Sequence, residues 1–93
     1  MYEAMLEEFE QFKADMENGE TFCKYMVEDD YEDEYSHNEI DEYMEKFEEK
    51  AREYLHEHIP GKYIVSGGWC VFVMTEEEAK KRNMHMYEEW LVR

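Results

Sequence analysis

The chain of 93 residues is long enough for one small domain with a hydrophobic core. It carries 26 Asp and Glu residues against 10 Lys and Arg residues, and its formal net charge at pH 7 is −16. Because this balance leaves no basic stripe to hold phosphates, it argues against direct binding to nucleic acid or to an anionic membrane. Disordered acidic chains are poor in aromatic residues, whereas 16% of this chain is aromatic. We therefore expect a single folded domain over residues 1–93.

The negative charge is confined to the first 60 residues. They hold 21 of the 26 acidic residues and 5 of the 10 basic ones, whereas the last 33 residues are electrically balanced. Acidity that is concentrated in one part of a folded chain produces a strong local field. Duplex DNA carries one charge per about 1.7 Å of its axis, so an excess of 16 charges matches about 27 Å of duplex.

The first predicted helix covers residues 2–17. Apolar side chains recur there at steps of three and four residues, and glutamates occupy the other positions. Gly19 follows as a stop signal, because glycine adopts a positive φ at little cost. A short second helix is predicted to begin at Thr21 and to bury Phe22 and Met26.

Residues 28–34 contain six acidic residues and one tyrosine, so we expect a solvated loop or a ragged helix end. Ser36 and Glu39 then have the spacing of a capping box. They predict a third helix that continues to His58. The apolar stripe of this helix consists of Ile40, Tyr43, Met44, Phe47, Ala51, Tyr54 and Leu55.

A β-hairpin is predicted in the neutral part of the chain. Residues 62–66 and 69–74 are rich in β-branched and aromatic residues, and the Gly67-Gly68 pair suits a tight two-residue turn. Both faces of this hairpin are apolar. We expect one face to pack on the helices and the other to be covered by the C-terminal tail or by a second copy in a homodimer.

The last predicted elements are a short helix and a strand. Thr75 and Glu78 form a second capping box, and the helix that they begin ends at Asn83. Residues 84–92 fit either a strand or a helix, and the helix-end signal at Asn83 favours a third strand. The expected fold class is α+β, with an acidic N-terminal half of three helices packed against a C-terminal hairpin, short helix and strand.

Sequence motifs for catalysis, metal binding and membrane insertion are weak. The contiguous acids at 28–34 lack the alternation and the glycine of a calcium loop, and Glu53-x-x-His56 is half of a di-iron motif in a single copy. Cys23 and Cys70 lack the paired spacing of a zinc site. No apolar run approaches the roughly 20 residues that cross a bilayer. We expect a non-enzymatic cytoplasmic protein with reduced thiols and without metal or cofactor.

Tyrosines stand among the carboxylates of the acidic region, and tyrosine is enriched at interface hot spots. This pattern predicts that the acidic region binds a partner. The candidate partner-binding residues are Glu28, Asp29, Asp30, Tyr31, Glu32, Asp33, Glu34, Tyr35, Asp41, Glu42, Glu45, Glu48 and Glu49.

In size, charge and lack of a catalytic motif, the chain resembles the small acidic DNA-mimic proteins that phages encode against host defences, including anti-CRISPR proteins. Residues 28–34 and the carboxylates of the third predicted helix carry this resemblance. Those proteins have no common fold, so no residue role is transferred from them.

The resemblance implies an inhibitor in the host cell cytoplasm. Its partner would be a basic nucleoprotein, a CRISPR effector or a similar nuclease, whose nucleic-acid channel the acidic face would occupy. The alternative is a non-mimic acidic interaction module, such as an antitoxin-like or assembly protein, that binds a basic partner protein through the same face.

Overall fold

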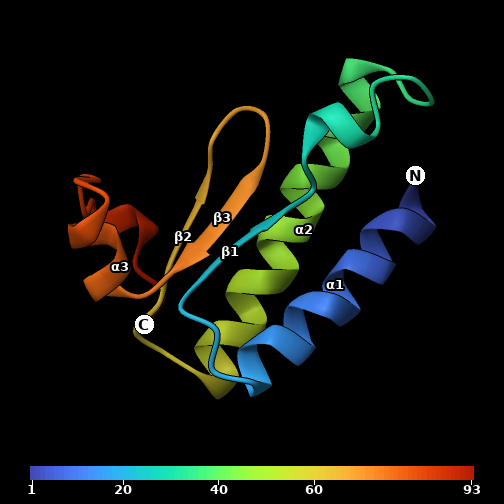
Figure 1. Cartoon of the computed structure of the whole chain (residues 1–93). Coiled ribbons are helices and arrows are strands. Elements are labelled where there is room, and N and C mark those ends of the chain that lie inside the picture. The colour runs from blue at the N-terminus through green and yellow to red at the C-terminus, as the bar shows by residue number, and fades with distance from the viewer.

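A three-stranded antiparallel sheet lies between two long helices and one short helix in the computed structural model, which describes residues 1–93 (Figure 1). The α+β class is confirmed. No helix combines the length and the apolar character needed to span a membrane. In chain order, the elements are α1 (Tyr2–Glu17), β1 (Phe22–Tyr25), a 3₁₀ turn (Glu28–Asp30), α2 (His37–His58), β2 (Tyr63–Ser66), β3 (Val71–Met74), α3 (Glu76–Lys81) and a second 3₁₀ turn (Glu88–Trp90).

The three helices with clear end signals are confirmed. α1 ends before Gly19, whose φ is +77°. α2 begins after Ser36, whose Oγ accepts a hydrogen bond from the Glu39 N–H at 3.3 Å. α3 begins after Thr75 in the same way, and Asn83 follows it with a φ of +55°. These local signals are sufficient to place the helix ends, because capping depends on residues within one turn of the end.

The two long helices run in the same direction. Tyr2 packs on Tyr43 near the start of both helices, with ring centroids 6.2 Å apart, and Phe12 packs on Tyr54 further along, at 5.5 Å. Both N-termini therefore lie at the end of the molecule that also carries residues 28–34 (Figure 1). Because helix N-termini carry partial positive charge, this end suits an acidic segment.

The predicted second helix is wrong. The segment after Thr21 forms strand β1, which pairs with β3 so that Phe22 lies opposite Met74 and Tyr25 opposite Val71. The sheet order is β1-β3-β2, so the third strand comes from the acidic half of the chain. The apolar residues of this short segment fit the repeat of a helix as well as that of a strand. The segment becomes a strand because it hydrogen-bonds to the edge of β3 that β2 leaves free. The N-terminal half thus contains two helices and a strand.

The hairpin is confirmed, but its turn is displaced by one residue. The Gly67 N–H donates to the Cys70 carbonyl at 2.7 Å, which makes Gly68 and Trp69 the two central residues. Gly68 has a φ of +84°. Glycine at the first central position is what a type II′ turn requires.

The third strand predicted over residues 84–92 is also wrong. This tail forms an extended segment and a 3₁₀ turn, and it reaches the sheet through one isolated bridge from Leu91 to Tyr63. Met84 and Trp90 pack against the sheet instead of joining it. This packing partly buries their apolar side chains without a continuous row of backbone hydrogen bonds to the sheet.

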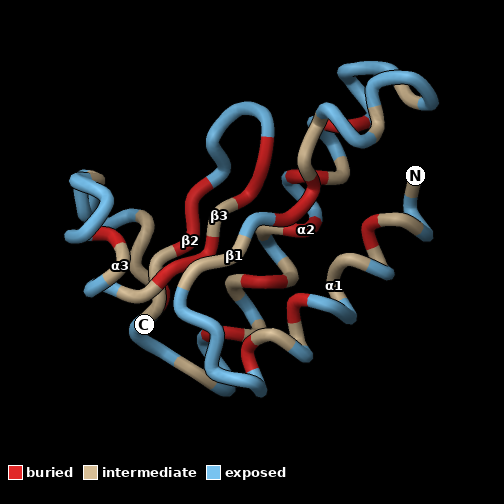
Figure 2. The backbone as a smooth tube through the Cα atoms, viewed as in Figure 1, coloured by how far each residue is buried: buried red, intermediate tan, exposed pale blue.

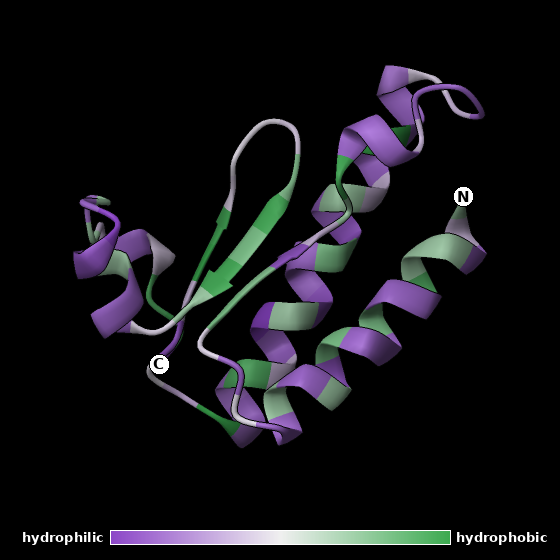
Figure 3. Cartoon of the chain, in the orientation of Figure 1, coloured by the Kyte–Doolittle hydropathy of each residue, from purple (hydrophilic) through white to green (hydrophobic).

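The sheet separates two apolar clusters of unequal size. Figure 2 shows buried residues on the strands, on the long helices and on α3. The larger one lies between the sheet and the long helices and includes Phe12, Phe47 and Ile64. The smaller one, on the opposite face, centres on Met74 and Ala79. α3 and the tail therefore pack on the second hairpin face. Figure 3 shows the hydrophilic residues that alternate with hydrophobic ones along both long helices.

Candidate acidic interaction surface

The outward side of α2 presents a row of carboxylates. Glu42, Glu45, Glu49 and Glu53 follow one another at three- and four-residue steps, and all four side chains are exposed, as is that of Asp41. Neighbours at this spacing lie about 5–6 Å apart. Over its 22 residues the helix is about 33 Å long, close to the longest dimension of the molecule, 35 Å.

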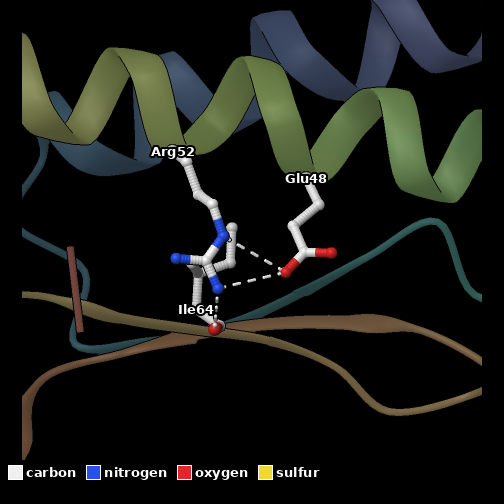
Figure 4. A network of polar contacts seen from close by, with 3 residues as sticks. All are labelled: Glu48, Arg52 and Ile64. Atoms are coloured by element: carbon white, nitrogen blue, oxygen red, sulfur yellow. Dashed lines mark hydrogen bonds and ion pairs between the residues drawn. The ribbon is translucent and has the colours of Figure 1, made fainter. Parts of the chain in front are cut away.

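Glu48, predicted as part of the same surface, points toward the sheet (Figure 4). Its Oε1 accepts hydrogen bonds from Nε and Nη2 of Arg52 at 3.3 and 3.2 Å. The same Nη2 donates to the carbonyl of Ile64 on β2 at 3.2 Å. Glu48 therefore helps to join α2 to the sheet, and the outward row does not include it.

Residues 28–34 form turns beside the N-terminus of α2, and most of their carboxylates are exposed. Glu28 is the exception, because it contacts Nδ1 of His37 and its N–H donates to the Trp69 carbonyl at 2.7 Å. Hydrogen bonding and like charge from Asp29 raise the pKa of Glu32. The exposed acids are Asp29, Asp30, Glu32, Asp33 and Glu34.

The acidic segment is fastened to α1 by one carboxylate. Glu8 accepts a hydrogen bond from the Tyr31 hydroxyl at 2.5 Å on one oxygen and from the Met26 N–H at 2.9 Å on the other. Met26 is fully buried with a φ of +53°, a conformation that costs energy for a residue with a side chain. Glu8 thus stabilises the bend at which the chain leaves β1 for the acidic segment.

The interleaved tyrosines have roles in the fold. Tyr25 is buried, and its hydroxyl donates to Oδ2 of Asp15 at 2.7 Å. Tyr31 and Tyr35 are half-buried and pack on each other. Burial is the main cause that raises the pKa of Tyr25 and of Tyr31, and the hydrogen bonds to carboxylates add to it. Only part of each half-buried ring is therefore free for a partner.

A second row of carboxylates, on α1, was not among the predicted site residues. Glu3, Glu7, Glu10 and Glu17 are exposed along one side of this helix. Their position outside the apolar stripe is visible in the sequence. Their relation to the α2 row depends on the parallel packing of the two helices on the same face of the sheet, which no local pattern reveals.

Aromatic rings and lysines lie between the two rows. Lys13 and Lys50 place their Nζ atoms 5.3 and 5.1 Å from the centroid of the Phe9 ring, and Lys46 lies 4.7 Å from that of Tyr43. A shallow cavity of about 220 Å³ opens here between α1 and α2. It is lined by Phe9, Lys50, Glu53, Tyr54 and Glu57.

Most of the acidity is not compensated within the molecule. Five of the 21 acidic residues in residues 1–60 make an ion pair, when those with histidine are counted. No group of three or more histidine, cysteine or acidic side chains is arranged to hold a metal ion. Burial raises the pKa of the Cys23 and Cys70 thiols, which disfavours the reactive thiolate form. The exposed carboxylates of the two helices and of residues 28–34 are suited to binding Lys and Arg side chains over a wide surface.

No protein-family model matches the chain, and no curated protein and no solved structure is detectably similar to it.

Proposed function

We propose that the protein is an inhibitor that binds the basic nucleic-acid channel of a host defence nucleoprotein, such as a CRISPR effector or a similar nuclease. The two rows of exposed carboxylates on adjacent helices are the observation that carries this proposal. A nucleic-acid enzyme holds phosphates with Lys and Arg side chains. Carboxylates that pair with the same cations would exclude the nucleic acid.

The spacing of the charges supports mimicry. Packed helices have axes about 8–10 Å apart, so the rows on α1 and α2 run side by side along a shared groove, as the phosphates of two DNA strands flank a groove. Both rows stand on helices that the larger core holds in place. Because the surface is formed before binding, little conformational entropy is lost when a partner binds.

A salt-dependent capture experiment with a nucleic-acid challenge tests the proposal. The protein is immobilised, bacterial lysate is applied at low and moderate salt, and duplex DNA is then added to the captured proteins. We expect nucleic-acid-binding proteins to be retained and then released by the DNA. A variant with Glu45→Lys and Glu49→Lys serves as the control that should retain none of them. A partner that stays bound in the presence of saturating DNA contradicts mimicry.

The non-mimic interaction module is the second candidate, and the hairpin tip favours it. Trp69 is 45% exposed and its carbonyl is bound by the first residue of the acidic segment, Glu28. An exposed tryptophan next to the acidic segment can anchor a partner protein outside any nucleic-acid channel. Under this alternative, Trp69→Ala weakens capture at least tenfold, and the bound partner still accepts DNA.

A further inference from the structure

The cavity between α1 and α2 has the size of a single side chain. Its volume of about 220 Å³ lies below the range of sites for small molecules, which begins at about 300 Å³. It is open to solvent between α1 and the C-terminal part of α2, beside the α2 row, to which Glu53 belongs. A protein that approached this surface would place its own side chains at the opening.

The aromatic walls of the cavity can accept a cation. The rings of Phe9 and Tyr54 are nearly perpendicular, with an interplanar angle of 88° and centroids 6.4 Å apart. Lys50 and Lys13 already lie within the cation–π distance of about 6 Å from the centroid of Phe9. The chain's own lysines thus mark a position where a positive group is favourable.

Two carboxylates border the same cavity and have no Lys or Arg partner. Glu53 makes no ion pair, and Glu57 has only His58, at 3.9 Å. They are four residues apart on α2 and therefore lie on the same side of the helix. Lys50 makes no ion pair either, so it is held there by the ring of Phe9.

We propose that this cavity binds the guanidinium group of an arginine side chain from the basic partner, an inference that rests on the proposed function for the source of the arginine. A planar guanidinium can stack flat on an aromatic ring and donate hydrogen bonds to two carboxylates from its edge, whereas an ammonium group has no plane to stack and donates from a single nitrogen. The arginine takes the place of Lys50 over Phe9, and Glu53 and Glu57 accept its N–H groups.

Paired peptides test the proposal. Nona-arginine and nona-lysine carry the same charge, so a general electrostatic attraction binds both equally. At an ionic strength of about 0.15 M, we expect the intact protein to bind nona-arginine about threefold to fivefold more tightly in calorimetric titrations. Lys50→Gln should increase this ratio, whereas Lys46→Gln, the same change of charge outside the cavity, should leave it unchanged.

Removal of the carboxylates has a matched control on the same helix. Glu53→Gln with Glu57→Gln should bring the ratio close to one. Glu42→Gln with Glu49→Gln should weaken both peptides by a similar factor and preserve the ratio. Equal affinities for the two peptides on the intact protein would overturn the proposal, as would an equal loss of the ratio in both double variants.

The peptide experiment and the capture experiment fail independently. A preference for arginine together with a captured partner that DNA does not displace preserves the cavity and removes mimicry. Displacement by DNA together with equal affinity for both peptides preserves mimicry and removes the arginine site.

Discussion

The two sides of the sheet differ in how many of their carboxylates are paired with cationic side chains. On the side of α1 and α2, exposed carboxylates stand in rows and most have no cationic partner. On the side of α3 and the tail, Glu78 lies 3.8 Å from Lys81 and 3.6 Å from Arg82, and Glu88 contacts Arg93. Three of the five acids in the last 33 residues make such an ion pair.

The sizes of the two cores explain how this difference is tolerated. Like charges on one face repel and destabilise the compact state. The larger cluster, with its edge-to-face aromatic rings, lies under the repelling rows, whereas the smaller cluster lies under the paired charges. Folding therefore does not require the acidic rows, and this separation is what an interaction surface with an external cationic partner needs.

The largest effect is expected from truncation of the larger core. Phe47 is fully buried between α2 and the sheet, so Phe47→Ala should lower the free energy of unfolding by about 3–5 kcal/mol. Phe72, on the other face, is only partly buried, and Phe72→Ala should cost about 1–2 kcal/mol. Urea denaturation measures both. Equal losses would show that the two sides support the fold equally.

The second effect concerns binding. Reversal of Asp29, Asp30, Asp33 and Glu34 to lysine should weaken binding to the captured partner by about a hundredfold or more, because opposed like charges are costly at an interface. Glu76→Lys and Glu77→Lys on the neutral side should change it by less than about threefold. A similar loss of affinity from both sets would show that binding is not confined to the acidic side.

The sequence predicts those parts of this fold that depend on nearby residues. Ser36 and Thr75 begin helices, and Gly19 and Asn83 follow helix ends, all as expected. The strand at residues 22–25 was predicted as a helix because its apolar residues fit both periods. Only its distant partner β3 selects the strand. The helix-end signal at Asn83 favours a strand over residues 84–92, but the tail packs on the sheet face and makes only one bridge, and no local pattern reveals this packing.

The candidate surface was predicted to a similar extent. Glu42, Glu45 and Glu49 are exposed on one side of α2 as their spacing indicates. The inward position of Glu48 depends on Arg52 and on the carbonyl of Ile64, which is contributed by another element. The row on α1 and the cavity beside it exist because two helices pack in parallel, a tertiary arrangement that periodicity within one helix does not determine.

A smaller effect is expected where Tyr31 joins the acidic segment to α1. Tyr31→Phe removes the hydrogen bond to Glu8 and should lower the free energy of unfolding by about 1–2 kcal/mol. Burial and that hydrogen bond raise the pKa of Tyr31 in the folded state above its unfolded value of about 10.

The sign of the pH dependence follows from this shift. Between the two pKa values the folded protein keeps a proton that the unfolded chain has lost, so stability falls as the pH rises above about 10. Thermal melts at about pH 8 to 11 bracket the titration of an unfolded tyrosine. Over this range the melting temperature should decline less steeply for Tyr31→Phe than for the unaltered protein. Tyr25, which is shifted in the same direction, maintains a residual decline in the variant. Parallel profiles would mean that Tyr31 does not contribute to the alkaline loss.

The smallest effect compares one substitution on the two sides of the sheet. Glu49 lies one turn from Glu45 and from Glu53 and makes no ion pair, so Glu49→Gln relieves repulsion and should stabilise the protein by about 0.2–0.5 kcal/mol. Glu78 makes ion pairs with Lys81 and Arg82 and lies in the first turn of α3, so Glu78→Gln should destabilise by about 0.5–1 kcal/mol. The two changes remove the same charge and differ only in their surroundings. Added salt screens exposed charges, so both differences should shrink toward zero at about 1 M ionic strength. Effects of the same sign in urea denaturation at low salt would contradict the distinction between a repelling and a compensated side.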